Sequence, residues 1–446
     1  MKRQKFIVGG IVVLLFSALV AGYGLMGCSP QSSSTPSQAA SSTGATTSST
    51  SQESVSSTTK TMQQWGLEFP LQYNSYATVK INPVDKDKEG HFSMKTKELA
   101  PILKDERGYK PLKSGDEQYY TIDWLTYNDT TGEWIVDDSK VNVVAQAKAY
   151  TKGCFSCRSS KYQEIEAREG VDIYKQPLDA EYIAEINGQE WDCALCHANT
   201  PEDPADSQLV YFINGSGDAY DEMDAGERVC GQCHSTMNHF SENHYRYGFE
   251  VDGIYKSKFE QGQTSTDEKT GITTASGIYL PDLEMVQTST MRKMGVTCVT
   301  CHMPEDTDND SGQTYTTHNA SGSPLENEKS LEKCLTCHKS QGISDTTAMK
   351  AMVRDLQARA KETLTALSDR CKATKEAIGV AVEAGNVDAA KLDVAREKYS
   401  LAYAYYQVAL GDPNIVGAKI AHNPEKTWEY SDTANSLLDE VDAALS

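Results

Sequence analysis

The last third of the chain carries a regular alternation of apolar and polar positions. From residue 349 onward, apolar residues recur every three or four positions, which is typical of one face of a long α-helix, until Gly385 and Asn386 end the pattern. A second run of the same period ends at Gly411-Asp412-Pro413. The sequence therefore predicts two long helices whose apolar faces form a core, with Cys371 buried as a small hydrophobe and the tyrosines packing between helices. The two faces consist of Met349, Met352, Leu356, Ala360, Leu364, Leu367 and Cys371, and of Leu392, Ala395, Tyr399, Ala402, Tyr403, Tyr406 and Leu410.

The middle of the chain lacks this periodicity. Clusters of Gly, Asp, Asn and Thr at residues 262–276 and 305–314 predict loops. Residues 119–137 predict a β-hairpin, because aromatic and β-branched runs flank Asp129-Thr130-Thr131-Gly132. We therefore expect a mainly α protein, with a loop-rich part at residues 62–342 and a long-helix part at residues 343–446.

The first sixty residues hold an apolar run followed by a polar one. A basic start and the apolar run 6–20 lead to Leu25-Met26-Gly27-Cys28, an order similar to a bacterial lipoprotein signal peptide, in which Cys28 becomes lipidated. A plain membrane anchor is the alternative. Residues 29–60 include 20 Ser or Thr among 32 positions and cannot bury enough apolar surface to fold, so we expect a tether. The protein is then exported and lipid-anchored to the outer face of the cytoplasmic membrane.

Charge and length narrow the class of protein. The 446 residues contain 42 basic and 63 acidic side chains, a net charge of 42 − 63 = −21. This excess of acid argues against nucleic acid as a partner, because phosphates need a basic face. The length allows roughly two to three folding units.

Ten of the twelve cysteines form five C-x-x-C pairs. Four pairs are followed at once by a histidine, which is the attachment motif of c-type haem: two thiols bond the haem and the next histidine binds its iron. Zinc knuckles and disulfides are the alternatives, but neither requires a histidine after each pair. We predict five covalent haems. The pairs are Cys154/Cys157, Cys193/Cys196, Cys230/Cys233, Cys298/Cys301 and Cys334/Cys337, and the proximal ligands are His197, His234, His302 and His338.

With these motifs the chain resembles the ammonia-forming cytochrome c nitrite reductases, also called cytochrome c552, over residues 85–446. The strongest stretch runs from Val296 through Cys298, His302-Met303-Pro304 and Thr317-His318 to the last motif. A GHAF-like motif of that family is matched by Gly90-His91-Phe92, and a downstream histidine is matched by His422-Asn423-Pro424. The family has five haems in this order.

The resemblance implies a second set of iron ligands. His318, His91 and His422 would be distal ligands of the second, third and fourth haems, respectively. The small number of histidines agrees with this assignment, because only five of the nine lie outside the motifs. Where the family places the distal histidine of the fifth haem, this chain has Met291, and methionine can also bind haem iron.

The chain departs from the family at the catalytic positions. The family's catalytic tyrosine and histidine align with Met237 and Leu280, and its calcium ligands align with Thr236 and with the stretch Gly277-Ile278-Tyr279. These positions lack the oxygen ligands that calcium prefers, so we expect no calcium site. Arg107 is the sole candidate for the family's catalytic arginine, since it is the only arginine between His91 and Cys154.

The first haem has an unusual motif, because Arg158 replaces the lysine that binds iron in the family. A guanidinium has no lone pair to offer iron. Lys161, His239 or His244 could bind instead, the haem could stay five-coordinate or water-ligated, or Arg158 could bind against expectation.

Two kinds of function follow from these observations. The resemblance implies six-electron reduction of nitrite to ammonium, whereas the lost catalytic residues favour an electron relay; reduction of another terminal acceptor is a further alternative. The expected partners are a membrane quinol-oxidising multihaem cytochrome as electron donor and a terminal reductase as candidate acceptor. The resemblance also implies a homodimer.

Overall fold

The computed structural model describes one folded unit within Ser57–Ser446. The described residues are 62–77, 125–128, 133–136, 152–156, 159–176, 182, 193–197, 205–318, 320, 323–413 and 415–446. Five of the predicted functional residues lie outside these ranges: Cys28, His91, Arg107, Cys157 and Arg158. The signal peptide, the tether and the ligands among these five therefore stay predictions.

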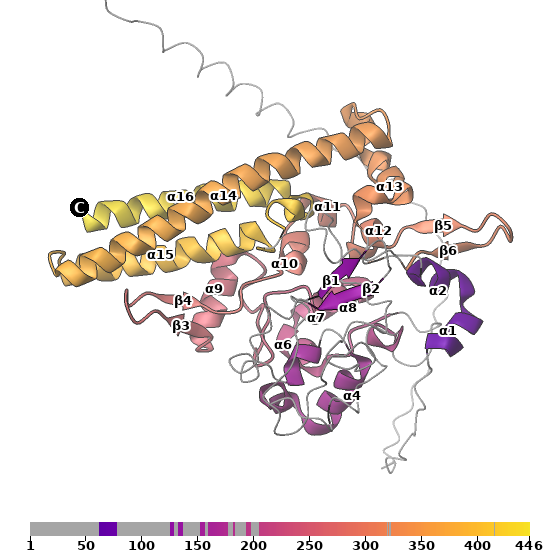
Figure 1. The fold of residues 1–446 in the computed structure, drawn as a ribbon, viewed down its shortest axis with the longest axis horizontal. Helices are drawn as coiled ribbons and strands as arrows, with labels where there is room; N and C mark the ends of the chain where they lie inside the picture. The colour runs from indigo at the N-terminus through magenta and orange to yellow at the C-terminus, as the bar shows by residue number, and fades with distance from the viewer. Residues whose placement is uncertain are drawn as a thin grey trace, which may run out of the picture. The chain divides into compact units, whose positions relative to one another are not determined.

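Three long helices form the C-terminal part, and they run side by side in Figure 1. They are α14 Thr346–Ala384, α15 Ala389–Leu410 and α16 Pro424–Leu445. The two expected long helices are confirmed, including the end of α14 at Gly385, whose φ of 61° suits glycine. The third helix, α16, was not predicted. It begins where the Asn423 side chain accepts a hydrogen bond from the Lys426 backbone N–H and Pro424 occupies the first turn.

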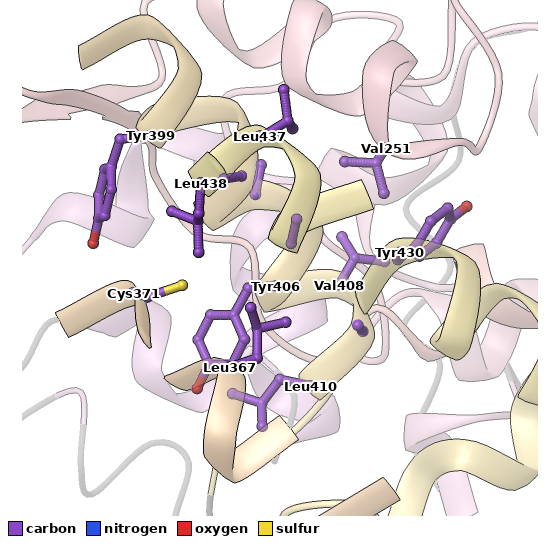
Figure 2. Packing of buried hydrophobic residues seen from close by; sticks show 14 of the residues in the cluster. Val251, Leu367, Cys371, Tyr399, Tyr406, Val408, Leu410, Tyr430, Leu437 and Leu438 are labelled. Atoms are coloured by element: carbon purple, nitrogen blue, oxygen red, sulfur yellow. The ribbon is translucent and has the colours of Figure 1, made fainter. Parts of the chain in front are cut away.

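The core of this part is made from the faces that the periodicity predicts. Figure 2 shows Cys371, Tyr406 and Leu438, from three different helices, around one interior. Cys371 is 2% exposed and burial raises the pKa of its thiol to about 11, as expected for a small core residue. Tyr399 and Tyr406 pack in the same cluster, which confirms that the tyrosine stripe belongs to helix packing.

Short helices separated by loops make up the part before α14. The longest, α13, has 11 residues. Among the described residues, no helix has both the length and the apolar character needed to cross a membrane. The elements are α1 Met62–Glu68, α2 Pro70–Ala77, η4 Lys152–Phe155, α4 Ser160–Glu169, η5 Val171–Lys175, η6 Cys193–Leu195, α6 Val210–Ser216, α7 Ala219–Glu222, α8 Ala225–Gly231, α9 Val251–Glu260, α10 Asp282–Gln287, α11 Thr290–Lys293, α12 Cys298–His302, η7 Pro324–Glu326, α13 Glu328–His338 and η8 Lys339–Gln341, with η9 Ala418–His422 between α15 and α16.

The predicted hairpin is present as the antiparallel pair β1 Leu125–Asn128 and β2 Glu133–Val136, with Leu125 opposite Val136. The two regions expected to be loops are also short hairpins: β3 Thr264–Thr266 pairs with β4 Thr273–Ala275, and β5 Glu305–Thr307 pairs with β6 Thr314–Thr316.

The same turn closes both of these unexpected hairpins. In each, an aspartate side chain accepts hydrogen bonds from the backbone N–H and the hydroxyl of a Thr or Ser three residues later, and a glycine with positive φ follows. The turns are Asp267 to Gly271 and Asp308 to Gly312. Side-chain bonds of this kind stabilise tight turns in short polar segments and so favour hairpins there.

Candidate haem sites

The proximal histidine of the second motif faces a histidine from a distant segment. The ring centroids of His197 and His318 are 6.1 Å apart, and the ring planes differ by 25°. Two imidazoles on opposite sides of one metal need about 6 Å, from two bonds of about 2 Å each and the half-widths of the rings. The separation fits an iron between them.

Both rings of this pair are held by their surroundings. The backbone of His197 follows η6, where its N–H donates to the Cys193 carbonyl at 2.9 Å. On the other side, His318 Nδ1 lies 2.9 Å from the Thr316 carbonyl oxygen, and its backbone N–H donates to Ser75 Oγ in α2 at 2.8 Å. Burial, opposed by the Thr316 carbonyl, lowers the pKa of His318, so the ring stays neutral and its Nε2 lone pair is available for a metal.

A second facing pair joins the fourth motif to the end of the chain. The ring centroids of His302, at the end of α12, and His422, at the end of η9, are 6.2 Å apart, with ring planes at 46°. Burial lowers the pKa of His302 to about 3, and nearby His422 and Lys419 act in the same direction. This pair, too, has the separation that an iron needs, and His302 offers a neutral nitrogen.

The third motif is organised by a carboxylate that the sequence analysis missed. His234 Nδ1 lies 2.7 Å from Asp282 Oδ2, which leaves His234 Nε2 for the metal. The same Asp282 lies 2.7 Å from Lys419 Nζ and 3.0 Å from His422 Nδ1. Burial by itself raises the pKa of Asp282, but Lys419, His422 and His234 together outweigh it and hold the pKa well below the ordinary value.

The fifth motif lies at the end of α13, and the structure shows fewer contacts for its proposed ligands. His338 is half-buried, and its Nδ1 has no hydrogen-bond partner among the described residues. Met291 lies half-buried in α11. Ligation of the fifth haem by Met291 stays a prediction.

The second cysteine of the motif differs in exposure from one site to the next. Cys196 and Cys233 are half-buried, and the backbone N–H of each donates to the carbonyl of the first cysteine of its own motif at 3.2 Å. Cys337 is instead exposed, in the last turn of α13. None of these three thiols is enclosed by the protein's own core in the way that Cys371 is. Cys337 therefore lies less deeply in the structure than Cys196 and Cys233. The thioether bonds predicted for these three cysteines stay predictions.

Consecutive motifs lie next to one another. The helix α12 of the fourth motif contacts both α8 of the third and α13 of the fifth. The Cys298 thiol interacts directly with Cys230, and burial together with Cys334 and Cys298 raises the pKa of Cys301 to about 12. Haems attached to these thiols would therefore lie next to one another, in the order of their motifs.

Near the first motif, the structure describes a half-buried histidine between two tyrosines. The ring of His239 stacks on Tyr174 at 3.8 Å and on Tyr211 at 3.9 Å, and its Nδ1 lies 3.7 Å from Glu166 Oε1 in α4. Burial lowers the pKa of His239, against the opposing effect of Glu166. Tyr174 also covers Gly153, the residue before Cys154, so closely that a Cβ there would overlap the ring.

The other two candidates for the first iron have different surroundings. Lys161 pairs with Glu164 at 2.6 Å on α4. His244 is fully buried, with Nε2 3.0 Å from Thr236 Oγ1. Of the three candidates, His239 contacts Tyr174, whose ring covers Gly153 next to the first motif, whereas Lys161 lies in the first turn of α4, shortly after that motif.

One position where the chain departs from the resembled family, Thr236, lies in a buried polar network. The backbone N–H and the hydroxyl of Thr236 both donate to Glu284 Oε1 at 2.8 Å, and the Tyr245 hydroxyl donates to the same oxygen at 2.9 Å. Lys258 is fully buried in α9, and burial lowers its pKa to about 7, opposed by the charge of Glu284. Met237 instead packs in an apolar cluster with Phe212.

Four attachment motifs with two facing histidine pairs define a multihaem c-type cytochrome with covalently bound haem. The chain belongs to the cytochrome c552 family, whose sequence profile matches residues 61–445. This confirms the resemblance to the nitrite reductases that the motifs indicated.

Two solved structures are similar. The catalytic subunit NrfA of cytochrome c nitrite reductase from Desulfovibrio desulfuricans, described for the relevance of its two calcium sites, matches over 88% of this chain and 87% of its own, with 18% identity and a TM-score of 0.59. The outer cell wall cytochrome OcwA matches over 76% of this chain and 61% of its own, with 17% identity and a TM-score of 0.34. The first likeness shows that the fold is shared.

Proposed function

We propose that this protein is a lipid-tethered pentahaem cytochrome that relays electrons in anaerobic respiration, outside the cytoplasmic membrane. A membrane quinol-oxidising cytochrome is the proposed donor, a terminal reductase the candidate acceptor, and two copies are expected to pair. The observation that carries the relay is the row of adjacent motifs with its two histidine pairs at 6.1 and 6.2 Å. Haem bound there supplies one-electron chemistry, and the chain fixes its orientation and excludes water.

The surroundings of the departing positions support relay over family-like catalysis. Met237 is buried in an apolar cluster, and Leu280 lies on a turn with φ 55°. Neither side chain can deliver a proton, and a positioned acid or base is typically worth about 10²–10⁴-fold in rate. With both partners replaced, nitrite turnover by this protein is expected to be several orders of magnitude slower than that of an authentic family member.

Ammonia-forming nitrite reduction is the second candidate, and one observation favours it. His239 is a half-buried base with a lowered pKa that stacks on Tyr174 beside the first motif, so it could replace the missing histidine. A haem reductase acting on another terminal acceptor would use the same group.

Spectroscopy and turnover separate these functions. The holoprotein is expected to show low-spin haems at the two histidine pairs, and replacing His318 with alanine should convert one haem to high spin, whereas Tyr315→Phe in the preceding strand β6 should not. Nitrite reduction should be slow when dithionite supplies electrons to the protein through a viologen mediator. Turnover at the rate of a family member, abolished by His239→Ala, would establish the second candidate instead.

Haem and calcium content test the cofactor part of the proposal. The intact mass after acid denaturation should exceed that of the lipidated polypeptide by five haem masses, and an excess of four would mean that Cys154 and Cys157 carry none. Chelator-washed protein should hold no stoichiometric calcium. Tight calcium in the metal analysis would show that Glu284 or its neighbours form a site after all.

A further inference from the structure

One carboxylate contacts side chains that belong to two different haem sites. Asp282 Oδ2 accepts from His234 Nδ1 of the third motif at 2.7 Å, and Oδ1 lies 3.0 Å from Nδ1 of His422, which faces His302 of the fourth motif. Lys419 Nζ completes the group, 2.7 Å from Oδ2. Asp282 is 9% exposed, so water does little to screen these contacts.

The backbone around Asp282 is tied to both sites. The N–H of the next residue, Leu283, donates to the His234 carbonyl at 2.9 Å. At the other end of α10, the Asn423 side chain donates to the Met285 carbonyl at 3.1 Å and to Thr288 Oγ1 at 3.2 Å. Because Asn423 directly follows His422, α10 is anchored next to both histidines, and the carboxylate is held between them.

A carboxylate that accepts the Nδ1 proton of a metal-bound imidazole makes the opposite nitrogen a stronger donor. A stronger donor stabilises ferric over ferrous iron and lowers the reduction potential of the haem. The second site offers a contrast, because His318 Nδ1 lies against the neutral Thr316 carbonyl, at 2.9 Å. Only a charged acceptor lowers the reduction potential of the haem to the full extent.

We propose that Asp282 is a positioning residue that sets the reduction potentials of the third and fourth haems together. Lys419 weakens this effect by neutralising part of the Asp282 charge. This inference rests on the proposed haem ligation by His234 and by the pair His302 and His422. Two haems whose histidines both contact one carboxylate respond jointly when that carboxylate changes.

The test is a redox titration of the five-haem holoprotein, followed by visible and EPR spectra. In Asp282→Asn, which keeps the shape but removes the charge, two of the haems should titrate at higher potential, and the EPR g-values of these two low-spin haems should change. In Lys419→Gln the same two haems should shift in the opposite direction. The haem between His197 and His318 should keep its potential in both variants.

Glu425→Gln is the matched control, because it removes one negative charge from an exposed site three residues after His422. It should leave all potentials close to those of the wild type. A shift of one haem alone in Asp282→Asn, an equal shift of all five, or the same direction of shift in Lys419→Gln would overturn the inference. If Asp282→Asn does not accumulate, Lys419→Gln still decides, through the direction of its shift.

The wild-type protein separates this inference from the proposed function. If it carries fewer haems than five, or if the fourth haem is high-spin, the proposed ligation fails. If the wild type has five haems with a low-spin fourth haem and Asp282→Asn shifts no potential, only the role of Asp282 fails.

Discussion

The three C-terminal helices and the region before them are held together in different ways. Helices α14, α15 and α16 bury residues such as Leu364, Ala402 and Leu438 almost completely against one another. In the earlier region the helices are short, and His197 and His318 are separated by the width of a metal site. A second such pair joins His302 of this region to His422, between α15 and α16. One chain thus combines a core made of its own side chains with a core that its cofactors complete.

Removing a haem should have the largest effect, and only on the earlier region. We expect the double change Cys298→Ser and Cys301→Ser to lower the intact mass by one haem and to make residues 205–342 sensitive to limited proteolysis, because the space between His302 and His422 is left without its occupant. The fragment containing α14 to α16 should resist. Cys371→Ala, a cysteine outside the motifs, should keep every haem. Equal cleavage of both regions would contradict the claim that only the earlier region depends on its haems.

Truncating a core side chain should destabilise the C-terminal helices and leave the haem sites unchanged. Leu438→Ala leaves a cavity in a fully buried position and should cost about 2–5 kcal/mol of unfolding free energy, measured by chemical denaturation of the C-terminal helices. Haem content and spectra should not change. Val394→Ala, at a position that is 45% exposed on α15, should alter stability by less than about 0.5 kcal/mol.

Lys258 gives a smaller effect that depends on pH. Its pKa is about 7 in the folded protein against an ordinary 10.5, so between these values the unfolded chain binds more protons and the Lys258 contribution to stability rises with pH. From pH 7 to 9 the wild type should therefore gain up to about 2 kcal/mol relative to Lys258→Met. The measurement is denaturant unfolding at both pH values.

Lys256→Met is the control for this experiment, because Lys256 lies in the same helix with 57% of its side chain exposed. It should leave the pH dependence as in the wild type. An identical pH slope in wild type and Lys258→Met would contradict the assignment of a depressed pKa.

The smallest effect is expected from a surface ion pair. Arg370 on α14 pairs with Asp439 and Asp442 on α16. Because these carboxylates are exposed, Arg370→Gln should cost no more than about 1 kcal/mol, and the loss should shrink at high ionic strength. Lys372→Gln, which touches only its neighbour Asp369, is the matched control. A loss as large as that of Leu438→Ala would mean that charge, and not packing, holds these helices together.

The sequence allowed some of this to be predicted, for physical reasons that differ by region. The periodicity of α14 and α15 reports burial directly, and α16 carried the same signal at Tyr430, Ala434, Leu438 and Val441, which the analysis did not use. The hairpins β3–β4 and β5–β6 were mistaken for loops because their turns are stabilised by aspartate side chains, not by an apolar pattern.

At the sites, the motifs identified haem attachment, but they could not identify the residues that surround the histidines. Asp282 and Glu284 are two of 63 acidic residues, and nothing in their spacing marks them as buried. Their roles arise from the folding of α10 against segments far along the chain. Likewise, the surroundings that distinguish His239, stacked on Tyr174 and Tyr211, from His244, which contacts Thr236, arise only in the folded chain.

The two facing histidine pairs also cross-link distant parts of the chain. The residues of each pair are separated by 318 − 197 = 121 and 422 − 302 = 120 positions. Under the proposed ligation, each haem is attached to the chain through thioethers and the proximal histidine at one end of such a loop, and a distal histidine binds its iron at the other end. Chain-entropy arguments assign about 4–5 kcal/mol to closing a loop of this length with a covalent link. A denatured chain that keeps these iron–histidine bonds is therefore already folded back on itself, with its last helix, α16, tethered to the fourth motif before any helix has formed.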